Sequence, residues 1–406
     1  MKLKENDNVP EIRFDYFKEE WDKKRFKNFT KLSQGLQIAI SSRFLEAGKH
    51  RYFYITNEFL NPNSTKKYYI ESPSENVICT VDDILMTRTG NTGKVVTNIS
   101  GAFHNNFFKV DYDKFETSKM FLYYLLTSNN IQKEIIIRAG NSTIPDLNHS
   151  DFYSIKTSVP ILAEQSAIGS LFSTLDDLLA SYKDNLANYQ SLKATMLSKM
   201  FPKVGQTVPE IRLDGFEGEW EKGTIGEFGS FYYGKSAPKW SVTDKATTPC
   251  VRYGELYTKF STKIDKIYSY TSIPKENLKL SSGNEVLVPR VGENPLDFAN
   301  CSWLSLKDVA IGEMISVYNT PKNPLFIAYY FNAKMKKEFA KRVEGGSVAN
   351  LYYTYLENIS ISMPSLPEQQ AIGTYFSNLD NLINSHQEKI TQLEALKKKL
   401  LQDMFI

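Results

Sequence analysis

The segment SVPILAEQSAIGSLFSTLDDLL, which begins at Ser158, returns as SMPSLPEQQAIGTYFSNLDNLI, which begins at Ser362. The match runs without a gap from residues 121–201 onto residues 325–405, at a constant offset of 204, and 19 of its last 44 positions are identical. The phrase VPEIRFDYFKEEW at Val9 likewise returns as VPEIRLDGFEGEW at Val208, with 9 of 13 positions identical. A period of about 200 residues far exceeds the roughly 20–50 of a solenoid repeat. The sequence therefore predicts two similar domains, each followed by a similar tail.

Composition is that of a globular chain: 41% of the 406 residues are hydrophobic and 13% are aromatic. No apolar run approaches the ~18–20 residues of a membrane span, and the N-terminal stretch lacks the apolar core of a secretory signal. Cys79, Cys250 and Cys301 are scattered and odd in number, which favours a reducing compartment over a disulfide framework. We therefore expect a cytoplasmic protein without a membrane segment. The net charge of +3 only weakly favours a polyanionic partner.

Apolar residues in both tails recur at spacings of three and four, which is the rhythm of a coiled coil. In the first tail the apolar repeat is interrupted at Asn185, where a core position holds a polar residue. A polar residue at a coiled-coil core position fixes the register at some cost in stability. A one-sided apolar stripe needs a partner, and the simplest partner is the other tail, in antiparallel pairing. The alternative is a pair of ordinary amphipathic helices, each packed on its own domain. The residues predicted to form the coiled coil or to dock partners are Leu171, Leu175, Leu178, Tyr182, Tyr189, Leu192, Met196, Tyr375, Leu379, Leu382, Leu393, Leu396 and Leu400.

The two heads are predicted to be mixed α/β domains. Short β-rich runs begin at Arg51, Lys94, Glu285 and Met314, and helical stretches lie near residues 121–137 and 324–343. The expected fold class is α+β, with two similar mixed α/β heads separated by two long helices that pair antiparallel. The expected domains are residues 1–157 (first head), 158–207 (first helix), 208–361 (second head) and 362–406 (second helix).

Alignment of the two heads selects basic residues that are candidates for contact with a polyanion. Arg88 and Arg290 each follow an apolar run and precede a glycine, a position suited to a phosphate or to the edge of a guanine. A surface arginine that caps a turn explains the pattern equally well. Lys94 lies just beyond the first of these loops.

A second set of candidates lies in the helix and loop that follow. Lys133 and Arg138 align with Lys337 and Arg342, and each arginine is placed for an ion pair with a glutamate four residues earlier, which is the simpler explanation than a phosphate contact. The hydroxyl groups in the loops GNSTIPDL and EGGSVANL are candidates to donate hydrogen bonds to a phosphate. Such loops are, however, more often plain turns. These hydroxyl residues are Ser142, Thr143 and Ser347. Tyrosine pairs, such as those at 232–233 and 352–353, are more typical of a core or a sheet than of a base-stacking platform.

Motifs of catalysis are missing from the sequence. It contains no phosphate-binding G-x-x-x-x-G-K-[ST] loop, no H-E-x-x-H, no paired Cys-x-x-Cys, and only four scattered histidines. The acidic-proline-aromatic motif of adenine-N6 methyltransferases is also absent. The sequence thus indicates a recognition protein without a catalytic site or a metal site of its own.

The organisation resembles the specificity subunit of a type I restriction–modification system. The resemblance covers essentially the whole chain: two variable heads, each opened by VPEIR with a tryptophan (Trp21, Trp220) and followed by P-x-L-x-E-Q-x-A-I and a long helix. It implies that each head reads one half of a bipartite, asymmetric sequence in double-stranded DNA, while the helices form a spacer. It also implies two methyltransferase subunits that use S-adenosylmethionine, and two motor–nuclease subunits that use ATP and Mg²⁺. The chain itself is then non-catalytic and binds none of these cofactors.

A function of another class remains open. Two heads on a coiled coil also fit a scaffold that binds protein partners and never reads DNA. Reversing the charge of Arg88 and Arg290 separates the two hypotheses, because it is expected to abolish DNA specificity only in the first.

Overall fold

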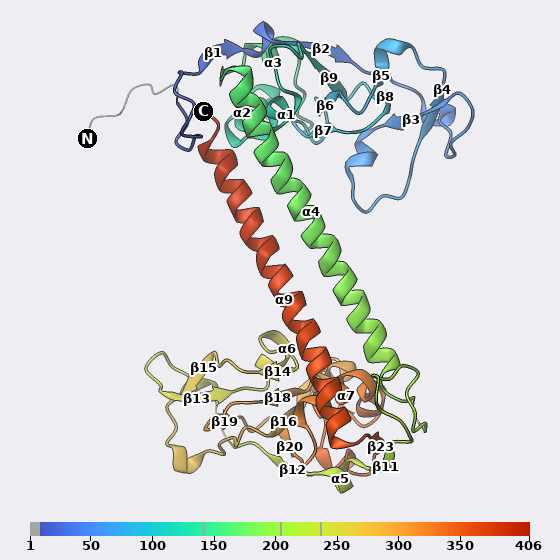
Figure 1. The fold of residues 1–406 in the computed structure, drawn as a ribbon, viewed down its shortest axis with the longest axis vertical. Helices are drawn as coiled ribbons and strands as arrows, with labels where there is room; N and C mark the ends of the chain where they lie inside the picture. Colours follow the sequence, from blue (N-terminus) through green and yellow to red (C-terminus); the bar gives the residue numbers. More distant parts are fainter. Residues whose placement is uncertain (1–8, 141–142, 204, 236–237) are drawn as a thin grey trace. The chain divides into compact units, whose positions relative to one another are not determined.

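The computed structural model describes residues 9–140, 143–203, 205–235 and 238–406, and its contacts divide the chain into two units (Figure 1). The first unit combines the chain up to Lys183 with Glu388–Ile406, and the second is the continuous segment Asp184–Gln387. Each unit therefore contains one head and a part of each long helix.

The first head is built of short strands and three helices, and its last strand, β10, leads into the first long helix. Its strands are β1 (Asp22–Arg25), β2 (Thr30–Gln34), β3 (Arg51–Ile55), β4 (Tyr69–Glu71), β5 (Ile78–Cys79), β6 (Ile84–Thr87), β7 (Val95–Thr97), β8 (Gly101–Phe103), β9 (Phe107–Tyr112) and β10 (Lys156–Val159). Its helices are α1 (Lys119–Thr127), α2 (Asn129–Ala139), α3 (His149–Ser154) and α4 (Leu162–Lys199), with 3-10 turns at Phe26–Asn28, Ile40–Ser42, Asn57–Leu60 and Glu75–Val77.

Strand β6 lies at the centre of the first head. It pairs antiparallel with β9 and β7 in a four-stranded sheet of order β2-β9-β6-β7. Alternate side chains of a strand point to opposite faces. Ile84 and Met86 accordingly pack in the core that α1 and α2 line, whereas Leu85 packs with Ile55 and Phe103 of the second sheet, β4-β3-β8-β5. Both faces of β6 are covered, which explains its uninterrupted apolar sequence.

The second head repeats this plan with additional short strands. Its strands are β11 (Glu221–Thr224), β12 (Ser230–Tyr233), β13 (Thr248–Val251), β14 (Lys263–Ile264), β15 (Ser269–Thr271), β16 (Glu285–Pro289), β17 (Val291–Gly292), β18 (Ser302–Leu304), β19 (Ala310–Ile311), β20 (Ile315–Asn319), β21 (Glu344–Gly345), β22 (Ala349–Asn350) and β23 (Ser360–Met363). Its helices are α5 (Ile225–Phe228), α6 (Glu255–Thr258), α7 (Pro324–Lys334), α8 (Lys336–Ala340) and α9 (Leu366–Asp403), with 3-10 turns at Lys239–Ser241, Lys275–Asn277, Pro295–Ala299 and Tyr353–Tyr355.

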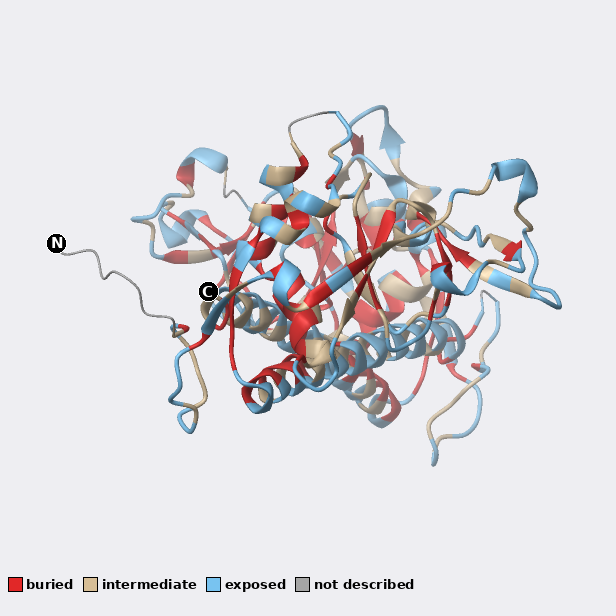
Figure 2. Ribbon diagram, turned by 90° about the horizontal axis from the view of Figure 1, so that it is seen from above, coloured by how far each residue is buried: buried red, intermediate tan, exposed pale blue. Residues whose placement is uncertain are grey.

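Strand β16 is the counterpart of β6. It is central in the sheet β12-β20-β16-β18-β14, and all five of its residues are buried. Val286 and Val288 face the core lined by α7 and α8, and Leu287 faces the other core. Figure 2 shows the buried residues gathered on the sheets of the heads and near the ends of the long helices. The predicted mixed α/β heads are confirmed.

Each helical stretch predicted before the end of a head is two helices in the structure. In the first head the break is at Ser128, whose extended backbone (φ −63°, ψ 148°) separates α1 from α2 while its hydroxyl donates to Leu125 O at 2.7 Å. In the second head α7 starts at Pro324, with the Asn323 side chain accepting from Phe326 N, and it ends just before Met335. Periodicity alone did not reveal these breaks because the apolar residues continue through them.

The two long helices pair antiparallel, as predicted. In the first unit Asp176 and Lys183 of α4 form ion pairs with Lys397 and Glu394 of α9, so residue numbers rise along one helix as they fall along the other.

The second unit shows the same direction of pairing. Lys193 of α4 forms an ion pair with Asp380 of α9, and the ring of Tyr189 lies 5.2 Å from that of His386.

The seam between the helices differs in part from the predicted stripe. Leu175 and Leu379 are buried in it, whereas Leu178 and Leu192 lie on an exposed flank and Asn185 is exposed. The interpretation of Asn185 as a polar core residue is therefore wrong, because the next residue, Leu186, occupies that position of the seam. The least exposed residues recur at spacings of four and three in both helices, with an offset of 204 between them: Ile168, Phe172, Leu175, Leu179, Tyr182, Leu186, Tyr189, Lys193, Met196 and Met200 in the first tail, and Ile372, Phe376, Leu379, Ile383, His386, Ile390, Leu393, Lys397, Leu400 and Met404 in the second.

Just beyond the end of each long helix lies an aromatic residue that completes a head core. In the first unit the Phe405 ring lies 5.7 Å from Phe121 and 5.8 Å from Phe172, and its side chain is 2% exposed.

In the second unit Phe201 has the equivalent place. Its ring is stacked on Phe376 at 5.8 Å and meets Phe326 at 5.6 Å and Trp220 edge-on at 6.4 Å. Each head is therefore closed by the end of the helix that follows the other head in the sequence.

The two repeated phrases of the sequence meet in the fold. Arg13 of the first VPEIR donates from Nε and Nη2 to the two carboxylate oxygens of Glu164 at 2.6 and 2.7 Å, and Arg212 does the same to Glu368 at 2.8 and 2.7 Å. Both glutamate side chains are 1% exposed. A buried carboxylate needs such a bidentate partner, so both phrases have a structural role.

We expect Phe405→Ala to destabilise the first unit by about 3–5 kcal/mol, because it removes a buried ring and leaves a cavity. Phe201→Ala is expected to destabilise the second unit to a similar extent. Hydrogen exchange read by mass spectrometry locates each effect, since protection falls only in peptides of the affected unit. Phe115→Ala is the matched control, because that side chain is 90% exposed. Equal loss of protection in both units from either variant would contradict the assignment.

Candidate nucleic-acid interface

The central strand of each head ends in an arginine. Arg88 directly follows β6, and Arg290 lies between β16 and β17. The loop after α2 in the first head and the loop after α8 in the second bond to the backbone of this arginine: Leu147 N donates to Arg88 O at 2.9 Å, and Leu351 N donates to Arg290 O at 2.8 Å. The structure thus brings together the two regions that the sequence selected independently in each head.

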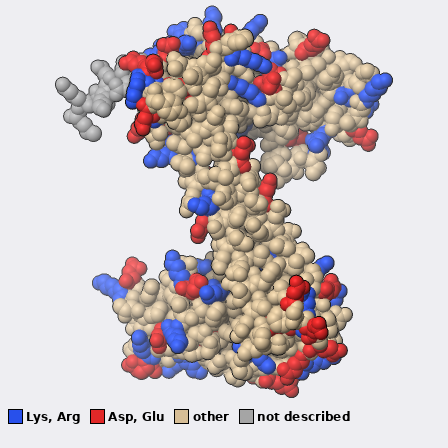
Figure 3. All heavy atoms as spheres, viewed as in Figure 1, with Lys and Arg blue, Asp and Glu red and all other residues tan. Residues whose placement is uncertain are grey.

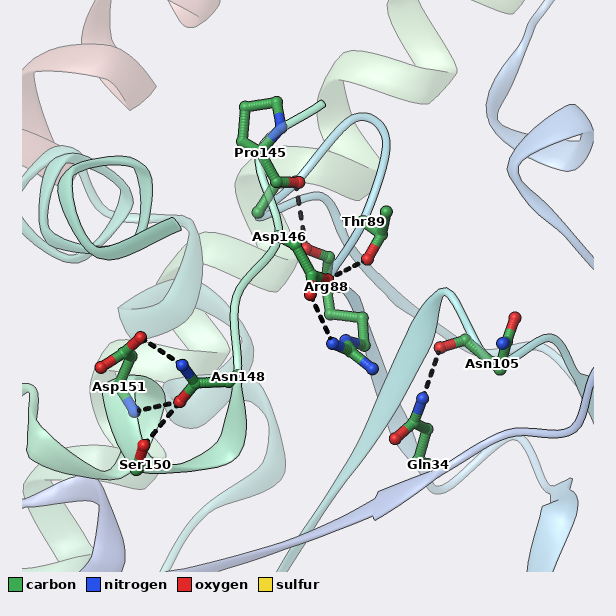
Figure 4. A network of polar contacts seen from close by, with 10 residues as sticks. Gln34, Arg88, Thr89, Asn105, Pro145, Asp146, Asn148, Ser150 and Asp151 are labelled. Atoms are coloured by element: carbon green, nitrogen blue, oxygen red, sulfur yellow. Dashed lines mark hydrogen bonds and ion pairs between the residues drawn. The ribbon is translucent and has the colours of Figure 1, made fainter. Parts of the chain in front are cut away.

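In the first head the arginine is held by a carboxylate (Figure 4). Arg88 Nη2 donates to Asp146 Oδ2 at 2.7 Å, and the Thr89 hydroxyl donates to the other oxygen of the same carboxylate. The guanidinium carbon lies 5.4 Å from the centre of the Phe108 ring. Arg88 Nε is buried and has no hydrogen-bond partner among the described residues. The Arg88 side chain is 19% exposed and that of Asp146 is 47% exposed, so the pair faces solvent.

The charge of Arg88 also reaches a neighbouring histidine. The pKa of His149 is lowered, mainly by burial and further by the Arg88 guanidinium. The neutral form of the His149 imidazole is therefore favoured beside Arg88.

In the second head the arginine lies between aromatic rings. The guanidinium carbon of Arg290 is 4.5 Å from the centre of the Tyr233 ring and 5.4 Å from that of Tyr352. Within the described part of the chain no carboxylate lies within ion-pair distance of Arg290, and its Nε is buried without a partner, as in Arg88. Cation–π contacts orient the guanidinium while leaving its outer donors available.

The loops beside the arginines differ in form. In the second head β21 and β22 make a hairpin that pairs with β17, and Ser347 lies exposed at its turn. In the first head the described part of the loop forms a single isolated β-bridge with the strand end, between Thr89 and Asp146. Thr143 of this loop is exposed. Ser142 lies outside the described residues.

The helix candidates have mixed surroundings. Lys133 on α2 and Lys337 on α8 are exposed, as is Lys94 just before β7. Arg138 forms an ion pair with Glu134, and Arg342 bonds Glu338 Oε2 at 2.9 Å, so the simpler explanation of both arginines holds in the structure. Hydrogen bonds from Lys341 and Arg342 lower the pKa of Glu338.

Four predicted leucines of the long helices are exposed and related by the repeat. Leu178 is the counterpart of Leu382, and Leu192 of Leu396, at the offset of 204. Their exposed fractions are 41%, 41%, 37% and 45% in that order. Each directly precedes a seam residue, which places all four on the same flank of their helices. The opposite flank carries ion pairs such as Lys183–Glu394 at 2.7 Å.

The remaining predicted helix residues lie in or beside the seam. Those that pack partly buried against the head cores are Leu171, Tyr189, Met196, Tyr375, Leu393 and Leu400, and Tyr182 is of intermediate burial.

The sequence did not single out Asp146, Tyr233 or Tyr352 as neighbours of the arginines. The sequence pattern of tyrosine pairs favours a core or a sheet. Two seam networks were also missed: Asp176 accepts from the Tyr124 hydroxyl at 2.8 Å as well as pairing with Lys397, and Asp380 accepts from the Tyr329 hydroxyl at 2.7 Å as well as pairing with Lys193. The signal was partial, because Asp380 follows Asp176 and Lys397 follows Lys193 at the offset of 204, whereas Tyr329 follows Tyr124 at 205.

Chemistry-bearing side chains outside these regions are few among the residues that the structure describes. The three cysteines are buried, and burial chiefly raises the pKa of the Cys79 and Cys250 thiols to about 11. No group of three or more histidine, cysteine, aspartate or glutamate side chains in the described ranges is arranged to hold a metal ion, and no helix there is long and apolar enough to cross a membrane. Acidic and basic side chains are interspersed over the visible face of each unit (Figure 3).

Two solved structures with a similar fold come from type I restriction–modification systems. One is the crystal structure of the S subunit of such a system from M. genitalium. Its alignment with this chain covers 98% of this chain and 99% of that one, with a TM-score of 0.61 and 16% identity. A chain from a study of complex assembly and conformational transition in a type I system gives a TM-score of 0.50 at 15% identity, covering 94% of this chain and 96% of that one.

Sequence comparison points to the same group. The type I restriction enzyme MjaVIII specificity subunit of Methanocaldococcus jannaschii is 22% identical over 420 residues, which cover 99% of this chain and 96% of that protein. The family model described as the type I restriction modification DNA specificity domain matches twice, at residues 18–190 and 217–395, once in each half of the chain. The chain therefore belongs to this family, that of the DNA specificity subunits of type I restriction–modification systems.

Proposed function

We propose that the chain recognises a bipartite, asymmetric sequence in double-stranded DNA, with each head reading one half. The observation that carries the proposal is the pair of strand-end arginines. Arg88 and Arg290 have equivalent positions, each beside a loop with an exposed hydroxyl residue, and each has a buried Nε without a partner among the described residues. Arginine is the residue most often used to read guanine in the major groove.

Unlike halves follow from the unlike surroundings of the two arginines. A carboxylate flanks Arg88, whereas two tyrosine rings flank Arg290. Exposed Lys94, Lys133 and Lys337 would contact phosphates, which position a protein on the duplex without reading its sequence.

The chemistry in this proposal belongs to partner subunits. Two methyltransferase subunits that use S-adenosylmethionine dock on the long helices, and two motor–nuclease subunits that use ATP and Mg²⁺ complete the restriction complex. The chain is a non-catalytic subunit. The exposed leucine flank supports docking, because Leu178 and Leu396 in the first unit are matched by Leu192 and Leu382 in the second. Two equivalent apolar surfaces fit two identical partners.

The DNA-reading role is tested by expressing the chain with its neighbouring methyltransferase subunit in a host without adenine methylation and sequencing the modified DNA. We expect one bipartite motif with a fixed gap. Arg88→Glu is expected to remove discrimination in one half of the motif and Arg290→Glu in the other, because a good arginine–guanine contact is worth about 1–3 kcal/mol of discrimination.

Lys49→Glu and Lys275→Glu are the matched controls, since they reverse an exposed charge in the same heads outside the arginine loops. Co-purification with the methyltransferase monitors assembly in every variant. If the wild-type complex assembles but yields no motif, the heads do not read DNA and the scaffold hypothesis is favoured instead.

The docking role is tested by placing a charge on the leucine flank. Leu178→Glu combined with Leu396→Glu, both in the first unit, is expected to weaken methyltransferase binding, because burying each leucine contributes about 1.5–3 kcal/mol. Analytical ultracentrifugation of the co-purified complex would show the loss of one partner subunit and retention of the other. Leu45→Glu, at a side chain 70% exposed outside the helices, is the control. Unchanged stoichiometry in the double variant would exclude this flank as the docking surface.

A further inference from the structure

In each head, a leucine of the loop (Leu147 or Leu351) donates its backbone N–H to the strand-end arginine. The residue just before this leucine differs between the two heads. It is Asp146 in the first head and Asn350 in the second, and the two share the offset of 204 that relates residues 121–201 to residues 325–405. Asp146 forms a bridge with Thr89, and Asn350 pairs with Val291. Since Thr89 and Val291 each directly follow a strand-end arginine, the two loop residues have the same place in their heads.

The side chains at this position have different chemistry. The Asp146 carboxylate only accepts hydrogen bonds, and it takes one from an Nη of Arg88 and one from the hydroxyl of Thr89. The Asn350 amide both donates and accepts, and it makes no side-chain hydrogen bond with any residue the structure describes. Asp146 thus places a negative charge beside one arginine, and the residue at the same place beside the other arginine is neutral.

We propose that this position is a specificity determinant, and that it makes the two heads select different bases beside their arginines. The proposal rests on the proposed function, in which the heads read DNA. In the first head, the Asp146 carboxylate accepts a hydrogen bond from an exocyclic amino group, N4 of cytosine or N6 of adenine, next to the base that Arg88 contacts. A base edge that presents only acceptors is repelled there.

The geometry of the ion pair supports this role. One oxygen of Asp146 is bonded to Arg88 at 2.7 Å, and almost half of the aspartate side chain remains exposed. A carboxylate has about four lone-pair sites, so acceptor capacity is left for a base. The bond to Thr89 fixes the carboxylate on its second oxygen, which limits the directions from which a donor can approach.

In the second head the same position selects differently. Arg290 lies over Tyr233 and Tyr352 with no carboxylate partner in the described ranges, so both Nη groups are available for a bidentate contact with O6 and N7 of a guanine. Asn350 beside it tolerates either a donor or an acceptor on the neighbouring base. The second head is therefore expected to require a guanine and to be less selective at the adjacent position.

Two reciprocal substitutions test the proposal in the complex with the methyltransferase subunit. Asp146→Asn is expected to relax one position of the first half-site, reducing discrimination there by roughly 5- to 150-fold, and to leave the second half-site unchanged. Asn350→Asp is expected to narrow one position of the second half-site to bases with an exocyclic amino group. Methylome sequencing reads both halves of the motif from one sample, so the untouched half is an internal control.

Asp82→Asn is the matched control for charge. It removes a carboxylate from the same head, at a side chain 67% exposed that lies 3.6 Å from Lys114. If Asp146→Asn leaves every position of the motif as in the wild type, or weakens both halves alike, the proposal is overturned. If that variant does not assemble, the test rests on the motif methylated by the Asn350→Asp complex. A new base preference in the second half of that motif supports the proposal, and an unchanged motif overturns it. Failure of the proposed function is distinct, because the wild-type complex then yields no motif.

Discussion

The structure depends on the burial of one aromatic residue at the end of each long helix. Phe405 fills the core of the first head beside Phe121 and Phe172, and Phe201 fills that of the second beside Phe326 and Phe376. Each ring comes from the helix that follows the other head in the sequence. In each unit, the complete head core therefore requires the antiparallel pairing of the helices.

Charged residues give this apolar arrangement its register. Lys397 and Lys193 occupy seam positions, where an isolated charge is costly, and each is paired with an aspartate that also accepts from a buried tyrosine. A shift of one helix along the other would leave a lysine unpaired. The Arg13–Glu164 pair and its counterpart add a second constraint at the start of each helix.

Much of this was predictable from the sequence, because duplication is visible without knowledge of contacts. The two heads, the long helices and their antiparallel pairing followed from the offset of 204 and the spacing of three and four. The seam was misplaced by one residue at Leu178, Asn185, Leu192, Leu382 and Leu396, since exposed and buried leucines have the same spacing signal. The strand-end arginines were found because an apolar strand followed by glycine is a local pattern. Asp146 and the tyrosines around Arg290 were not, because they approach from parts of the chain distant in sequence.

The division of the chain reverses the order in which its halves can finish folding during synthesis. The second unit is one continuous segment, Asp184–Gln387, whereas the first also needs Glu388–Ile406. At roughly 5–20 residues per second, the ribosome adds residues 388–406 about 10–45 s after Lys183. During that interval the first head lacks Phe405, and the rings of Phe121 and Phe172 that pack against it are exposed to water. The half that is made first is thus the half that is completed last, and it is the one most in need of protection while the chain is being translated.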